Sequence, residues 1–85
     1  MNNLKVQKKD GRVEDFDIDK IKNGIMASGA TEVQVQNVAA EIESWASTHS
    51  INGIVRTPDL KAKLLEILSG VNPKAKANFE SFKKD

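Results

Sequence analysis

Apolar and polar residues alternate at the start of the chain, a pattern that is typical of short β-strands. Two such runs flank the dipeptide Asp10-Gly11, a strong signal for a tight turn, so we predict a hairpin over residues 4–16. A two-residue turn would place on one face Leu4, Val6, Lys8, Val13 and Asp15. A three-residue turn shifts the second strand by one residue, and the sequence leaves both registers open. In either register Lys8 lies on the apolar side of its strand, where a lysine extends to solvent or meets an anion.

Apolar residues at helical spacing predict four helices in the rest of the chain. The first runs from Asp17 or Ile18 to about Ser28, because Asp17 suits an N-cap and Gly29 suits a C-terminal stop. Its apolar stripe comprises Ile18, Ile21, Ile25 and Met26.

The second predicted helix begins at a capping box, in which Thr31 and Gln34 satisfy each other's backbone N–H groups. The polar residues 47–50 are expected to end it. Its apolar stripe comprises Val35, Val38, Ala39, Ile42, Trp45 and Ala46.

The third and fourth predicted helices begin alike, with a cap residue followed by proline. Thr57-Pro58 opens the third helix and Gly70 closes it, while Asn72-Pro73 opens the fourth. The residues expected to point inward from these two helices are Leu60, Leu64, Ile67, Leu68, Ala75, Phe79 and Phe82.

The predicted elements add up to an α+β fold, a small β-hairpin packed on a four-helix bundle. The β-branched segment 51–55 is compatible with a third, short edge strand beside the hairpin. With 85 residues the chain is expected to form a single domain over residues 1–85.

Charge is distributed unevenly along the chain, although the formal net charge is only +1. Residues 1–24 hold six of the 13 basic side chains and residues 61–85 hold another six, whereas none lies between Gly24 and Val55. A compact fold could bring both ends of the chain together around one anion. On charge alone, solvated lysines with no common focus are the alternative.

Few residues in this chain suit catalysis or metal binding. Cysteine and tyrosine are absent, and the single histidine, His49, is expected to interact with a helix C-terminus rather than to act in catalysis. Aromatic residues at core-compatible positions make direct nucleic-acid binding an unfavoured interpretation. No apolar run reaches the roughly 20 residues of a membrane span and no signal peptide is recognisable, so a cytoplasmic location is expected.

The region around the turn has the strongest functional signal. Lys8, Lys9 and Arg12 crowd the hairpin, and a helix N-terminus follows directly, so cations and free backbone N–H groups can face the same phosphate chain. The pattern V-x-K-[KR]-D-G-x-x-E-x-[FI]-[DN]-x-x-K-I over residues 6–21 resembles the start of the ATP-cone family, a nucleotide-sensing domain best known from ribonucleotide reductases. Segments 52–60 and 78–84 are also similar to the family pattern.

The resemblance implies a set of residues that contact ATP or dATP, with Mg²⁺ accompanying the nucleotide. It assigns Val6 and Ile21 to the adenine base and Lys8, Lys9 and Lys20 to the phosphates. The other positions that match nucleotide contacts of the family are Glu14, Asp17, Thr57, Lys61, Lys83 and Lys84. Lys9 stands where many members have arginine, so it lacks the bidentate guanidinium.

By the same resemblance the chain is expected to be a non-catalytic allosteric domain. It would be either a free-standing protein or one domain of a longer protein. It would act on a ribonucleotide reductase subunit, on another protein in trans or through a homo-oligomer. Two alternatives stay open: a degenerate cone that serves as a protein-interaction module without nucleotide, and a fragment of a nucleic-acid-binding repressor.

Overall fold

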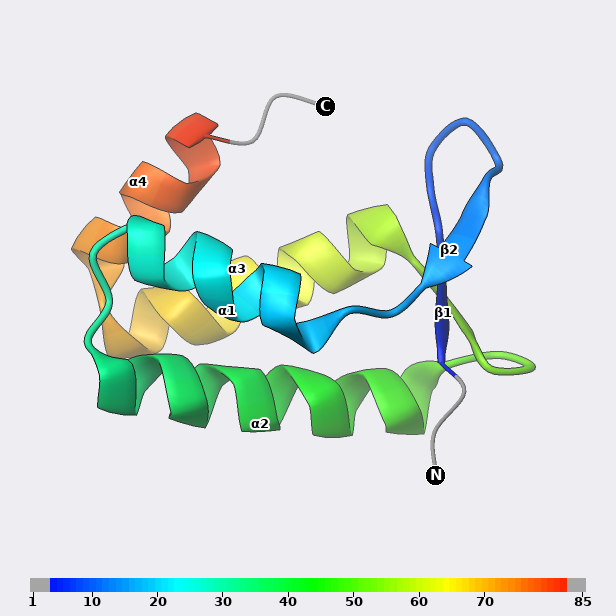
Figure 1. Cartoon of the computed structure of the whole chain (residues 1–85), viewed down its shortest axis with the longest axis horizontal. Helices are drawn as coiled ribbons and strands as arrows, with labels where there is room; N and C mark the ends of the chain where they lie inside the picture. The colour runs from blue at the N-terminus through cyan, green and yellow to red at the C-terminus, as the bar shows by residue number, and fades with distance from the viewer. Residues whose placement is uncertain (1–3, 83–85) are drawn as a thin grey trace.

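Strands gather at one end of the molecule and helices fill the rest (Figure 1). The computed structural model describes residues 4–82. Along the described chain the elements are β1 (Lys5–Gln7), β2 (Val13–Asp15), α1 (Ile18–Ala27), α2 (Glu32–His49), β3 (Ile54–Arg56), α3 (Thr57–Val71) and α4 (Pro73–Phe82). In Figure 1, α2 runs beneath α1 and α3, and α4 packs on both of these helices at the end away from the sheet. The predicted α+β class is confirmed.

The sheet has the strand order β2-β1-β3, with β1 antiparallel to β2 and parallel to β3. The predicted edge strand is therefore present, over residues 54–56. Ile51, which the prediction included, only forms an isolated bridge and is 76% exposed. Because β3 lies beside β1 rather than beside β2, it brings the start of α3 next to the hairpin loop.

The hairpin uses the three-residue turn of the two that the sequence allowed. The Lys8 N–H donates to the Arg12 carbonyl at 2.7 Å, and the Gly11 N–H donates to the Lys8 carbonyl at 2.9 Å. Gly11 has a φ of +95°, the left-handed conformation that such loops require and that glycine adopts without strain. This register pairs Val6 with Glu14, so Val13 lies on the other face and is 48% exposed.

The beginnings of α1 and α2 are as predicted, but one residue of the predicted apolar stripe of α1 is exposed. Asp17 caps α1, and the reciprocal bonds of Thr31 and Gln34 form the capping box of α2. Met26 was wrongly placed in the apolar stripe, because Ile25 occupies its centre, fully buried, while Met26 is 47% exposed. The polar residues 47–50 end α2 as predicted, since its last residue is His49 and Ser50 is the C-cap, and the Thr48 hydroxyl donates to the Ser44 carbonyl at 2.9 Å.

The junctions at both ends of α3 also differ from the prediction. The cap at Thr57 was wrong by one residue, because β3 runs directly into α3 and Arg56 takes the cap position without a side-chain bond. Gly70 does not close α3, which continues to Val71. The predicted cap of α4 is confirmed, since the Ala75 N–H donates to Asn72 Oδ1 at 3.0 Å.

Side chains from all four helices meet the sheet in one apolar core. The largest fully buried members are Ile25, Val35, Val38, Ile42 and Leu68. Phe79 on α4 is buried against α1, where Gly24 leaves room for its ring: a Cβ at Gly24 would lie 3.0 Å from Phe79 Cε1. Trp45 is partly buried and packs against this core, so its predicted role as a core residue is confirmed, and Phe16 packs there as well. The Phe82 side chain lies outside the described part of the chain.

Candidate functional site

Three predicted site residues share one face of the sheet, the face that packs against the helices. Val6 pairs with Glu14 on β2 and with the buried Val55 on β3, and paired residues of neighbouring strands point to the same side. Lys8, two residues beyond Val6, reaches Glu14 with its Nζ 4.0 Å from Oε1. The three-residue register therefore brings Val6, Lys8 and Glu14 together, an apolar residue beside a cation and its counter-charge.

The start of α1 holds three further predicted residues. Asp17 Oδ1 accepts hydrogen bonds from the N–H groups of Asp19 at 3.0 Å and Lys20 at 3.4 Å. This capping fixes the first helical turn, which carries the exposed Lys20 and the partly buried Ile21. Asp17 thus has a structural role, because its hydrogen bonds hold the first turn of α1 in place.

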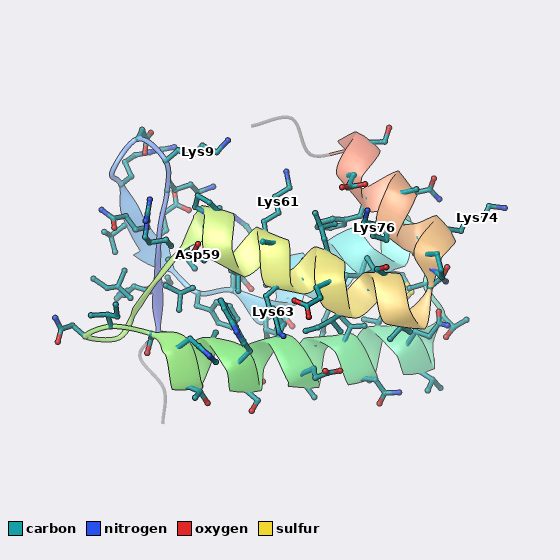
Figure 2. The ribbon with its side chains drawn as sticks, turned by 180° about the vertical axis from the view of Figure 1, so that it is seen from behind. Lys9, Asp59, Lys61, Lys63, Lys74 and Lys76 are labelled. Carbon is teal, nitrogen blue, oxygen red and sulfur yellow. The ribbon has the colours of Figure 1, made fainter. Side chains whose placement is uncertain are left out.

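The first turns of α3 carry two further predicted residues, Thr57 and Lys61. Thr57 Oγ1 is buried and has no hydrogen-bond partner within the described part of the chain. A buried hydroxyl without a partner is destabilising by about 1–3 kcal/mol, so such a group fits a polar atom of a ligand. Figure 2 shows the Lys61 side chain rising from α3 on the side away from α2, and the Lys9 side chain extending from the hairpin toward the helices.

Ion pairs hold several charges of the hairpin in place. Arg12 Nε lies 2.9 Å from Asp10 Oδ2, and Arg12 Nη1 lies 4.0 Å from Glu14 Oε2. The backbone N–H of Arg12, together with its charge, lowers the pKa of Asp10. The pKa of Asp15 is lowered by its hydrogen bond and charge interaction with Lys5. Arg12 is therefore engaged by the hairpin's own carboxylates, Asp10 and Glu14.

Two cavities flank β3. The smaller, about 380 Å³ in volume, lies between the hairpin loop and the start of α3 and is lined by Gln7, Lys8, Lys9, Gly11, Arg56 and Pro58. The larger, about 480 Å³, lies between α2, β3 and α3, and its lining includes Trp45, His49, Arg56, Lys63 and Glu66. The larger cavity contains none of the predicted residues, whereas the smaller contains Lys8 and Lys9.

Arg56 is a cationic residue that sequence reasoning did not place in the site. It lines the smaller cavity together with Lys8 and Lys9, the two lysines predicted to bind phosphates, because β3 pairs with β1. This pairing joins residues far apart in the sequence, so no local pattern predicts it. Lys83 and Lys84, predicted to return to the phosphates, lie outside the described residues. Among residues 4–82 no group of three or more His, Cys, Asp or Glu side chains is placed so that it could hold a metal ion.

The sequence that forms this arrangement matches a known family. Residues 4–81 match the sequence model of the ATP cone domain. The chain belongs to this family. An ATP cone is a regulatory, nucleotide-sensing domain rather than a catalytic one. A search of the curated proteins finds no match. In the described part of the chain, no helix combines the length and apolarity needed to cross a membrane.

Proposed function

We propose that this ATP cone binds ATP or dATP between the hairpin and the first turns of α1 and α3, and that it regulates a partner without catalysing a reaction. The observation that carries the proposal is the register of the hairpin, which sets Val6, Lys8 and Glu14 on the helix-facing side of the sheet. An apolar residue next to a cation on one face suits a ligand with a flat base and an anionic tail.

Each residue has a distinct part in this proposal. Val6 and Ile21 contact the adenine base, since both are partly buried and border the core. The phosphate ligands are Lys8, Lys9, Lys20 and Lys61, with Lys83 and Lys84 as predicted further contacts. The hydroxyl of Thr57 gains in the nucleotide the hydrogen-bond partner that the described residues do not supply. Glu14 holds Lys8 and Arg12 in position.

Regulation follows from unequal binding of the nucleotide to two states of an assembly. A nucleotide that binds one state more tightly shifts the equilibrium toward it by the difference in binding free energy. In our proposal the assembly is a homo-oligomer, or a complex with a ribonucleotide reductase subunit or another cytoplasmic protein, and residues 1–85 act as a single domain within it.

Titration calorimetry and thermal unfolding with ATP and dATP test the proposal. We expect dissociation constants on the order of micromolar, which correspond to a binding free energy of about −8 kcal/mol. ATP at about 100 times its dissociation constant should then raise the free energy of unfolding by about 2.7 kcal/mol. Adenosine and a pyrimidine triphosphate are the controls that separate base from phosphate recognition. No heat and no shift in Tm at millimolar ATP would contradict nucleotide binding and favour a cone that acts as a protein-interaction module.

A further inference from the structure

The smaller cavity has an unusual charge pattern. Its three titratable lining residues are Lys8, Lys9 and Arg56, and all three are cations. Two of them come from the hairpin and one from the end of β3, so the two walls of the crevice belong to segments almost 50 positions apart in sequence. Cations that converge on one crevice repel each other unless an anion lies between them.

The backbone on both sides fixes the position of Arg56. In the parallel register Arg56 is the partner of Gln7, the residue directly before Lys8. Val55, one residue earlier, is anchored in the core, and Pro58, two residues later, lies in the first turn of α3. The guanidinium is therefore carried by a segment that is held at both ends, which favours binding of an anion in a defined geometry.

Arg56 and Arg12 provide a contrast between two arginines at the same end of the molecule. Arg12 is paired with Asp10 and Glu14. No carboxylate oxygen of the described residues lies within 4.0 Å of the Arg56 side-chain nitrogens, although Asp59 and Glu66 line the larger cavity with it. Arg56 thus keeps its charge available where Arg12 does not.

From this geometry we propose that Arg56 binds the terminal phosphate of the nucleoside triphosphate. The assignment rests on the proposed function. By its register Arg56 shares with Gln7 the face of the sheet opposite to Val6 and Glu14. Lys8 lies just beyond the end of β1, where it reaches Glu14 and also lines the crevice, so a phosphate chain that rounds the strand end at Lys8 reaches Lys9 and Arg56. Arginine binds phosphate through two parallel N–H groups, and Arg56 supplies from the opposite wall the planar fork that a lysine at position 9 lacks.

The test compares Arg56→Gln with Arg12→Gln, two variants that remove the same charge from the same end of the fold. Titration calorimetry is carried out with ATP, ADP and AMP. Arg56→Gln should weaken ATP binding by about tenfold or more and ADP or AMP binding by less than about threefold, because the lost contact is to the terminal phosphate. Arg12→Gln should change all three affinities by less than about threefold, since exposed ion pairs contribute little.

A third variant and a stability control complete the experiment. Arg56→Lys keeps the charge without the fork and should bind ATP with intermediate affinity. The Tm of the ligand-free variants should equal that of the parent chain within a few degrees, because Arg56 is exposed. Equal losses for Arg56→Gln and Arg12→Gln, or equal losses of ATP and AMP affinity in Arg56→Gln, would overturn the assignment. A parent chain that binds no ATP would instead overturn the proposed function, and this assignment with it.

Discussion

The helical body and the hairpin end of this cone differ in what their residues do. In the body, Val38 and Ile42 on α2 belong to the same core as Leu68 on α3, and all three are fully buried. At the hairpin end, strands of three residues carry exposed charges, and the apolar Val13 is about half exposed. The body supplies most of the apolar burial, whereas the hairpin end supplies the groups that suit a nucleotide.

This difference indicates how binding and stability are divided. A two-stranded hairpin is marginal by itself in water, so this hairpin depends on β3 and on Leu4, which ties β1 to the core. Residues at the hairpin end can then be selected for a ligand with little loss of core packing. The nucleotide, in turn, should stabilise chiefly the end where it binds.

The largest expected effect on folding lies in the body. Ile42→Ala should lower the free energy of unfolding by about 3 kcal/mol, since it leaves a cavity in a fully buried position. Urea unfolding measures the change, with Val33→Ala as the control, because Val33 on the same helix is 70% exposed. Equal stability of the two variants would contradict the account that burial in the helical body carries most of the folding free energy.

The largest expected effect on binding lies in the hairpin. Lys8→Ala should weaken ATP binding by about tenfold or more with little change in Tm, because a charge-assisted hydrogen bond contributes about 1.5–3 kcal/mol. Adenosine binding should hardly change. Lys74→Ala is the control, since Lys74 points away from the molecule at the end opposite the hairpin (Figure 2). If the Lys8 variant bound ATP as tightly as the parent chain, the placement of the phosphates would be wrong.

Thr57→Val should have opposite effects on stability and on ATP affinity, because it replaces one buried oxygen atom, Thr57 Oγ1, by a methyl group. Replacing the buried hydroxyl by a methyl group should raise the free energy of unfolding by about 1 kcal/mol and lower ATP affinity by about fivefold, the effect of one neutral hydrogen bond. Thr48→Val on α2 is the control, because its hydroxyl already bonds the Ser44 carbonyl and lies on another element. A less stable Thr57→Val protein would show that the hydroxyl has a partner within the chain.

The smallest expected effect is the pH dependence of two hairpin carboxyl groups, those of Asp10 and Asp15. The pKa of Asp10 is held below its ordinary value of 3.8, first by the hydrogen bond from the Arg12 N–H, and that of Asp15 by Lys5. A carboxyl group whose pKa is lowered in the folded state stabilises the fold at pH values above its ordinary pKa. This contribution to the free energy of unfolding is lost as the pH falls through the lowered pKa. The amide and side-chain shifts of Asp10 and Asp15 should therefore titrate with midpoints below 3.8. Midpoints at or above 3.8 for these two residues would contradict the hydrogen bonds and ion pairs described for the hairpin.

Local sequence signals predicted most of the fold, but not the long-range strand pairing that sets which side chains lie together at the candidate site. Caps such as Asp17 and Asn72 were predictable because their partners lie within three residues. The position of Glu14 beside Val6 depended on the choice between two turns that the sequence allows equally. Arg56 was missed because its place in the crevice comes from the pairing of β3 with β1, and Thr57 was taken for a cap because the strand before the helix was not anticipated to run into it.

The most direct test of the account is an NMR titration of the whole ¹⁵N-labelled chain with ATP. The account predicts that the largest amide shifts fall on residues 6–9, 14, 20–21, 56–57 and 61, while the larger cavity around Trp45 and His49 changes little. Shifts concentrated at Trp45, His49 and Lys63, or no shifts at about millimolar ATP, would contradict nucleotide binding between the hairpin and the helices.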